Sequence, residues 1–124
     1  MRWGSAASTA PTLAAAVDEA AGSVRAALDG VAPDLVVAFV SPHHAATFDE
    51  LPGLVRAALG GGLLLGCSAG GVIGAGRELE EQPGLSLTAA SLPGVTISPF
   101  HLEAPERPPT RHDEAPTFIL LPDP

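Results

Sequence analysis

The sequence has 124 residues, a formal net charge of −8, 46% hydrophobic residues and only 4% aromatic residues. All six of its Lys or Arg positions are arginine. Nucleic acids and anionic membranes are bound by clustered Lys and Arg, and the sequence holds no such cluster. We therefore expect one domain with an aliphatic core, no nucleic-acid or membrane partner, and no lysine-dependent chemistry such as a Walker phosphate site.

The single cysteine, Cys67, excludes an internal disulfide and any cysteine-rich metal site. No apolar run of signal-peptide length follows the first residues, and none approaches the roughly 20 residues of a membrane span. These features predict a cytoplasmic protein that needs neither a metal nor a cofactor.

The first half alternates strand and helix. Residues 3–8 form a plausible strand, and Thr9 and Thr12 are both candidate caps for a helix that Gly30 ends. The apolar run 35–40 does not alternate, which is typical of a parallel strand covered on both faces. A second helix follows, with Asp49 as the predicted cap and Pro52 in its first turn, and residues 63–67 form another apolar strand.

The second half changes character. Residues 85–90 and 95–98 predict an antiparallel hairpin around the Pro93-Gly94 turn. Residues 103–116 are charged and proline-rich and predict an irregular loop, whereas 117–121 resemble a last buried strand. The predicted fold is α/β: a mixed β-sheet with a parallel βαβαβ first half, an added antiparallel hairpin, and helices packed on the sheet.

Two loops follow the carboxyl ends of the predicted parallel strands, where open sheets bind ligands. One is Ser41 to His44 and the other is the glycine-rich stretch Cys67 to Gly76. The second has neither the dinucleotide-binding glycine spacing nor a Walker lysine. Its N–H groups suit a small anion such as a carboxylate, but a tight turn without a ligand explains the glycines equally well.

Cys67 allows two interpretations: a nucleophile activated by His43 or His44, or a small inert thiol. The inert thiol is favoured because free cysteine is among the most buried residue types. Ser41 and Ser68 suit hydrogen bonding to a ligand better than nucleophilic attack, because no Gly-x-Ser-x-Gly elbow surrounds them. The histidines lack the spacing of a metal site.

The segment from Leu64 to Gly74, Leu-Leu-Gly-Cys-Ser-Ala-Gly-Gly-Val-Ile-Gly, resembles the Gly-Cys-Ser/Thr segment of FIST N-terminal domains. The similarity extends over most of the chain, from about Trp3 to Leu121. It implies a sensory module that recognises small molecules such as amino acids. Such modules combine an N-terminal and a C-terminal FIST domain, in bacterial signalling proteins and some eukaryotic F-box proteins. The residues that match the family motif are Gly66, Cys67, Ser68 and Gly71.

Residues 1–124 are thus expected to be a single, incomplete FIST N-like domain without a C-terminal FIST domain. The predicted function is binding of a small polar metabolite for signal transduction, without catalysis. The expected partners are that ligand and a C-terminal FIST domain or output domain. The alternatives are a thiol enzyme using Cys67 with His43 or His44, and a ligand-free interaction or scaffold fragment. The predicted ligand-binding residues are Ser41, His43, Gly66, Cys67, Ser68, Ala69, Gly70 and Gly71.

Overall fold

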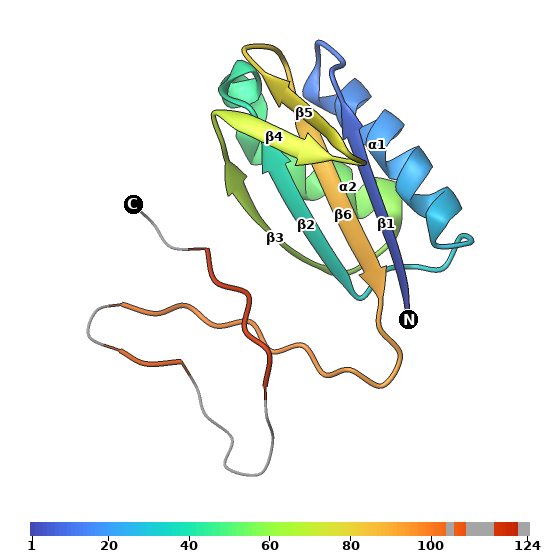
Figure 1. Ribbon diagram of the computed structural model, residues 1–124, viewed down its shortest axis with the longest axis vertical. Coiled ribbons are helices and arrows are strands. Elements are labelled where there is room, and N and C mark those ends of the chain that lie inside the picture. The colour runs from blue at the N-terminus through green and yellow to red at the C-terminus, as the bar shows by residue number, and fades with distance from the viewer. Residues whose placement is uncertain (104–105, 109–115, 122–124) are drawn as a thin grey trace.

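The fold is given by a computed structural model that describes residues 1–103, 106–108 and 116–121 (Figure 1). Strands and helices alternate in the first half, and short strands dominate the second. In chain order the elements are β1 (Arg2–Ser8), α1 (Leu13–Ala27), β2 (Leu35–Val40), the 3₁₀ helix η1 (Pro42–Glu50), α2 (Leu51–Leu59), β3 (Leu63–Ser68), β4 (Gly71–Gly74), β5 (Arg77–Glu80) and β6 (Leu85–Ser91).

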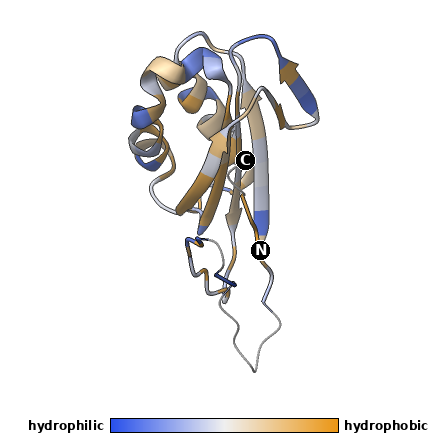
Figure 2. Cartoon of the chain, turned by 90° about the vertical axis from the view of Figure 1, so that its left-hand side faces the viewer, coloured by the Kyte–Doolittle hydropathy of each residue, from blue (hydrophilic) through white to orange (hydrophobic). Residues whose placement is uncertain are grey.

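The main sheet has four strands in the order β1-β6-β2-β3. β2 and β3 are parallel, and their register runs from Leu35 opposite Leu63 to Val40 opposite Ser68. β6 is antiparallel to both of its neighbours, so β1, β2 and β3 point the same way. Figure 2 shows the helices on one side of this sheet and the β4–β5 hairpin on the other. The α/β class, the mixed sheet and the packing of helices on it are therefore confirmed.

Local signals in the sequence set the helix ends. The Thr12 hydroxyl caps α1 by accepting a hydrogen bond from the Ala15 N–H at 3.3 Å. Gly60 ends α2 in the left-handed conformation, with φ +77°. The predicted cap of α2 is one residue early: Glu50, not Asp49, precedes the helix, because η1 runs directly into α2. Among the described residues, no helix is long and apolar enough to cross a membrane.

The main core lies between the helices and the sheet. Alternate β2 residues Val36, Ala38 and Val40 belong to it, together with the apolar side of α1. The intervening residues Val37 and Phe39 lie on the other face and are only half-buried. The unbroken apolar run of β2 thus has one face fully covered by helices, while the opposite face is covered in part.

The predicted hairpin between residues 85–90 and 95–98 is wrong. The turn at Pro93 and Gly94 does form, with the Val95 N–H bonded to the Leu92 carbonyl at 3.1 Å, but residues 95–98 are not a strand. β6 is inserted between β1 and β2, so both of its edges are already paired. No edge of β6 is left for a hairpin partner. The hairpin of this fold is β4–β5, within the stretch predicted to be a glycine-rich loop.

The tail differs from expectation as well. Residues 117–121, predicted to be a buried strand, have no regular secondary structure and are exposed and unpaired with the sheet. The described residues of the predicted loop 103–116 have no regular secondary structure, and its other residues lie outside the described part of the chain.

Candidate functional site

The carboxyl ends of β2 and β3 lie side by side, as the predicted parallel pairing requires. Val40 is opposite Ser68, and the Ala69 N–H donates to the Val40 carbonyl at 3.0 Å. The chain after β2 continues into η1, and the chain after β3 continues into the β4–β5 hairpin. The two segments predicted to form a site therefore begin at the same end of the sheet.

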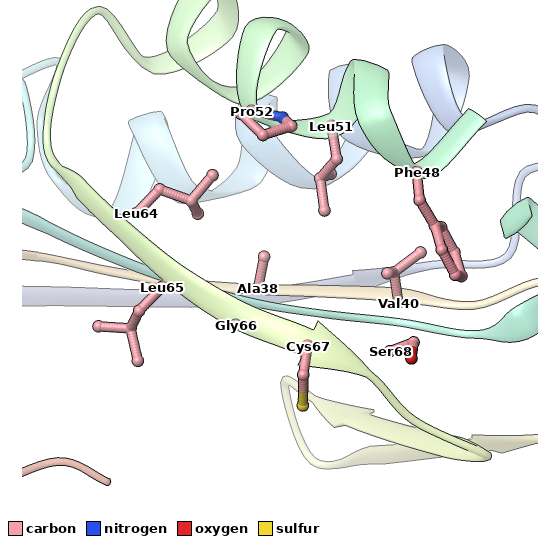
Figure 3. Close-up of a pocket in the computed structure, with 10 residues that line it drawn as sticks. All are labelled: Ala38, Val40, Phe48, Leu51, Pro52, Leu64, Leu65, Gly66, Cys67 and Ser68. Carbon is pink, nitrogen blue, oxygen red and sulfur yellow. The ribbon is translucent and has the colours of Figure 1, made fainter. Parts of the chain in front are cut away.

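A cavity of about 340 Å³ lies along β3, from Leu64 to Ser68, between this strand and the layer formed by η1 and α2, and not beyond the strand ends. Figure 3 shows the lining side chains of both layers. Their shared property is apolarity: no charged side chain lines the cavity, and the Ser68 hydroxyl is its one oxygen-bearing side chain. The lining residues are Ala38, Val40, Phe48, Leu51, Pro52, Leu64, Leu65, Gly66, Cys67 and Ser68.

Three of the predicted site residues, Gly66, Cys67 and Ser68, line this cavity. The other five are not among its lining residues: Ser41, His43, Ala69, Gly70 and Gly71. The sequence interpretation missed the contribution of η1 and α2, chiefly Phe48, Leu51 and Pro52. The sequence did contain a signal for these three residues, namely their position. They lie in the helical segment directly after β2, so they are expected near the end of the sheet at which β2 ends.

Gly66 is required by the packing of the two parallel strands. A Cβ atom built there would lie 1.8 Å from the Ala38 carbonyl oxygen and 2.8 Å from its carbonyl carbon. No rotation of a side chain relieves such a contact, because the obstacle is the backbone of β2. The glycine of the Gly-Cys-Ser segment therefore lets β3 approach β2 at the wall of the cavity.

The Cys67 thiol does not point into the cavity. Figure 3 shows its sulfur on the side of β3 opposite Leu64 and Leu51, so Cys67 lines the cavity through its backbone. The thiol is exposed, which corrects the interpretation of Cys67 as a buried residue. Among the described residues, no hydrogen bond joins it to His43 or His44, as the thiol-enzyme hypothesis would require.

Ser41 is a structural residue at the end of β2. Its side chain is 1% exposed, and its hydroxyl accepts a hydrogen bond from the Gly84 N–H at 2.9 Å. Its own N–H donates to the Gly84 carbonyl at 2.8 Å. The hydroxyl also lies 3.3 Å from Nδ1 of His43, an exposed residue. Ser41 thus fastens the end of β2 to the start of β6.

His44 is a buried polar residue at 4% exposure, and its Nε2 atom has no hydrogen-bond partner among the described residues. Desolvation lowers the pKa of His44, and the neighbouring His43 lowers it further. The neutral imidazole is therefore the form that the fold accommodates.

Two glycines of the β4–β5 hairpin, Gly71 and Gly74, have packing roles. A Cβ at Gly74 would lie 2.6 Å from the Ala6 carbonyl oxygen, and one at Gly71 would lie 3.0 Å from the Glu80 side chain. Gly74 thus lets the hairpin pack closely on the sheet, whereas Gly71 leaves room for a side chain within the hairpin itself. Contact of Gly70 and Gly71 with a ligand stays a prediction. Across the described ranges, no group of three His, Cys, Asp or Glu side chains is placed to hold a metal ion.

The family model of the FIST N domain matches residues 34–124 of this chain. Two uncharacterized proteins of Mycobacterium tuberculosis, from strains CDC 1551 / Oshkosh and H37Rv, are each 33% identical to it over 103 residues. The match covers 83% of this chain and 26% of each relative, so the chain spans about a quarter of the length of these relatives. No solved structure matches the chain.

Proposed function

Because the chain belongs to the FIST N domain family, whose members are generally sensory domains of signalling proteins, we propose that it binds a small ligand as part of a sensory module. The observation that supports this proposal is the cavity along β3, beneath η1 and α2. Its volume of about 340 Å³ falls within the usual size of ligand pockets, and its lining is mostly apolar, as such pockets generally are.

The lining defines the class of ligand. Leu51, Phe48 and Leu64 offer an apolar surface, and no side chain there carries a charge to pair with an ionic ligand. The polar groups within reach are the Ser68 hydroxyl and the backbone of β3. We therefore propose a small metabolite with an apolar body and a polar end that bonds to the Ser68 hydroxyl; an aliphatic or aromatic amino acid would fit with its side chain inside the cavity and its ammonium and carboxylate in water. The proposed role is binding, with no catalytic step.

A thermal-shift screen of the twenty amino acids and of short carboxylic acids tests this proposal. A ligand at 100 times its dissociation constant stabilises the folded state by about 2.7 kcal/mol, which raises Tm by roughly 10 °C for a domain of this size. A screen in which no compound raises Tm, repeated on the chain joined to the further domain of its relatives, contradicts the proposal.

Three variants locate the ligand once one is found. Ala38→Leu places three more carbons in the cavity and should abolish binding, while Ser68→Ala should weaken it by roughly tenfold through loss of one hydrogen bond. Cys67→Ser is the matched control, because that side chain points away from the cavity. If Cys67→Ser weakens binding as much as Ser68→Ala, the ligand lies elsewhere.

The face of the sheet opposite the helices supports a further part of the proposal. Trp3 on this face is 52% exposed, and Val37, Phe39 and Leu65 are half-buried. An apolar face of this kind suits packing against another domain, and the relatives are about four times as long as the matched region. We propose a C-terminal FIST domain or an output domain as this partner. The single exposed thiol suits a reducing compartment, which favours the cytoplasm.

A further inference from the structure

β3 lies at the edge of the sheet but lacks the residues that normally keep an edge strand from pairing with another strand. Its sequence, Leu-Leu-Leu-Gly-Cys-Ser, contains no charge and no proline, the residues that normally prevent an edge from pairing. In the described part of the chain, no strand pairs with its outer side.

The hydrogen bonds of β3 show which backbone groups face outward. The Leu63 N–H donates to the Asp34 carbonyl at 2.9 Å, and the Ala69 N–H donates to the Val40 carbonyl at 3.0 Å. Alternate residues of a parallel strand bond to the same neighbour, so Leu65 and Cys67 also pair with β2. The N–H and C=O groups of the residues between them therefore point away from the sheet. These outward residues are Leu64, Gly66 and Ser68, which also line the cavity.

The segment of residues 117–121, Thr-Phe-Ile-Leu-Leu, has the complementary properties. It is uncharged and contains residues that favour strands, and it is exposed and outside any strand of the structure. Four large apolar side chains stand in water there, which is unfavourable for so short a segment. Their exposed fractions are 39% for Phe118, 53% for Ile119, 56% for Leu120 and 42% for Leu121.

Aromatic packing joins this segment to the chain that follows β6. The ring of Phe118 packs edge-to-face on Phe100, with centroids 5.9 Å apart and an interplanar angle of 81°. Three residues before Phe100, Ile97 packs in one cluster with Leu35 and Leu65 on the face opposite the helices. Three residues span roughly 10 Å when extended. Figure 1 draws the segment, in red, below the β3 side of the sheet.

We propose that residues 117–121 are a strap that closes on the outer edge of β3 and adds a strand to the sheet. The closed strap satisfies the outward N–H and C=O groups of Leu64, Gly66 and Ser68, and removes its own apolar side chains from water. Because these three residues also line the cavity, the closed strap forms an additional wall of the cavity at this edge. A strap on the same chain has a high effective concentration, so its pairing outcompetes that of a dilute second chain.

Amide hydrogen exchange measured residue by residue tests this proposal. In the unaltered chain, the N–H groups of Leu64, Gly66 and Ser68 should exchange at least about tenfold more slowly than in Ile119→Pro/Leu120→Pro. Adjacent residues of a strand point their N–H groups in opposite directions, so the double substitution removes a donor whichever register the strap adopts. The N–H groups of Leu65 and Cys67, bonded to β2, should be equally protected in both proteins and so report that the sheet is intact.

The matched control is Thr96→Pro/Ser98→Pro, which alters two exposed residues in the chain after β6. It should leave the exchange of the N–H groups of residues 64–68 unchanged. The proposal is overturned if Leu64, Gly66 and Ser68 exchange as fast in the unaltered chain as in Ile119→Pro/Leu120→Pro. It is also overturned if their protection grows with protein concentration as the mass doubles, since a second copy then occupies the edge. No ligand enters this experiment, so its failure leaves the sensory proposal standing.

Discussion

Replacing Gly66 by alanine is expected to destabilise the fold severely. The added Cβ would lie 1.8 Å from the Ala38 carbonyl oxygen and 3.1 Å from the Ala38 nitrogen, so β3 must move away from β2. Inserting a methyl group into a filled space costs about 1–3 kcal/mol, and about two ladder hydrogen bonds near this pair are lost at about 1 kcal/mol each. The free energy of unfolding should therefore fall by about 3–5 kcal/mol, which is a large part of the 5–15 kcal/mol typical of a domain.

Urea unfolding followed by circular dichroism measures this loss. Gly70→Ala is the matched control, because a Cβ at Gly70 meets no atom within 4 Å. It should change the free energy of unfolding by less than about 0.5 kcal/mol. If Gly66→Ala is as stable as Gly70→Ala, the close approach of the two strands is not the reason for this glycine, and a role in ligand contact becomes the better explanation.

Three more predictions concern the polar residues near the cavity. Because the pKa of His44 is lowered in the folded state, stability should be full above the unfolded value of about 6.5 and fall as the pH drops below it. Urea midpoints at pH 7.5 and 5.5 check this, and an equal pH dependence in His44→Leu contradicts it. Ser41→Ala leaves the buried Gly84 N–H unpaired and should cost about 1–3 kcal/mol in urea unfolding, whereas Ser98→Ala at an exposed site should cost almost nothing. Cys67 is exposed and should react with a thiol reagent at the rate of an unstructured cysteine. A much faster reaction that is lost in His43→Ala would favour the thiol-enzyme alternative.

Elements with local signals are predictable from the sequence. Thr12 and Gly60 act through hydrogen bonds and backbone angles within a few residues of their own positions, so both helix ends are readable. The continuous apolar runs of β2 and β3 identify strands of a parallel pair, and parallel pairing brings Val40 and Ser68 to the same end of the sheet. These features bring the two strand ends together, but the cavity lies along β3 and is completed by η1 and α2.

Other features depend on which strand edges and sheet faces are already occupied in the folded protein, and these are visible only in the structure. Residues 95–98 follow a genuine turn, yet they cannot pair with β6 because β1 and β2 lie on its two sides. The glycine-rich stretch after Cys67, predicted to be a loop, forms the β4–β5 hairpin instead. Gly74 fits against the Ala6 backbone only when this hairpin folds onto the sheet. Ser41 and Cys67 each lie near the end of a strand in the sequence. In the structure, Ser41 is bonded to Gly84, whereas Cys67 is exposed to solvent. These outcomes depend on contacts between residues far apart in the chain, and no local pattern records them.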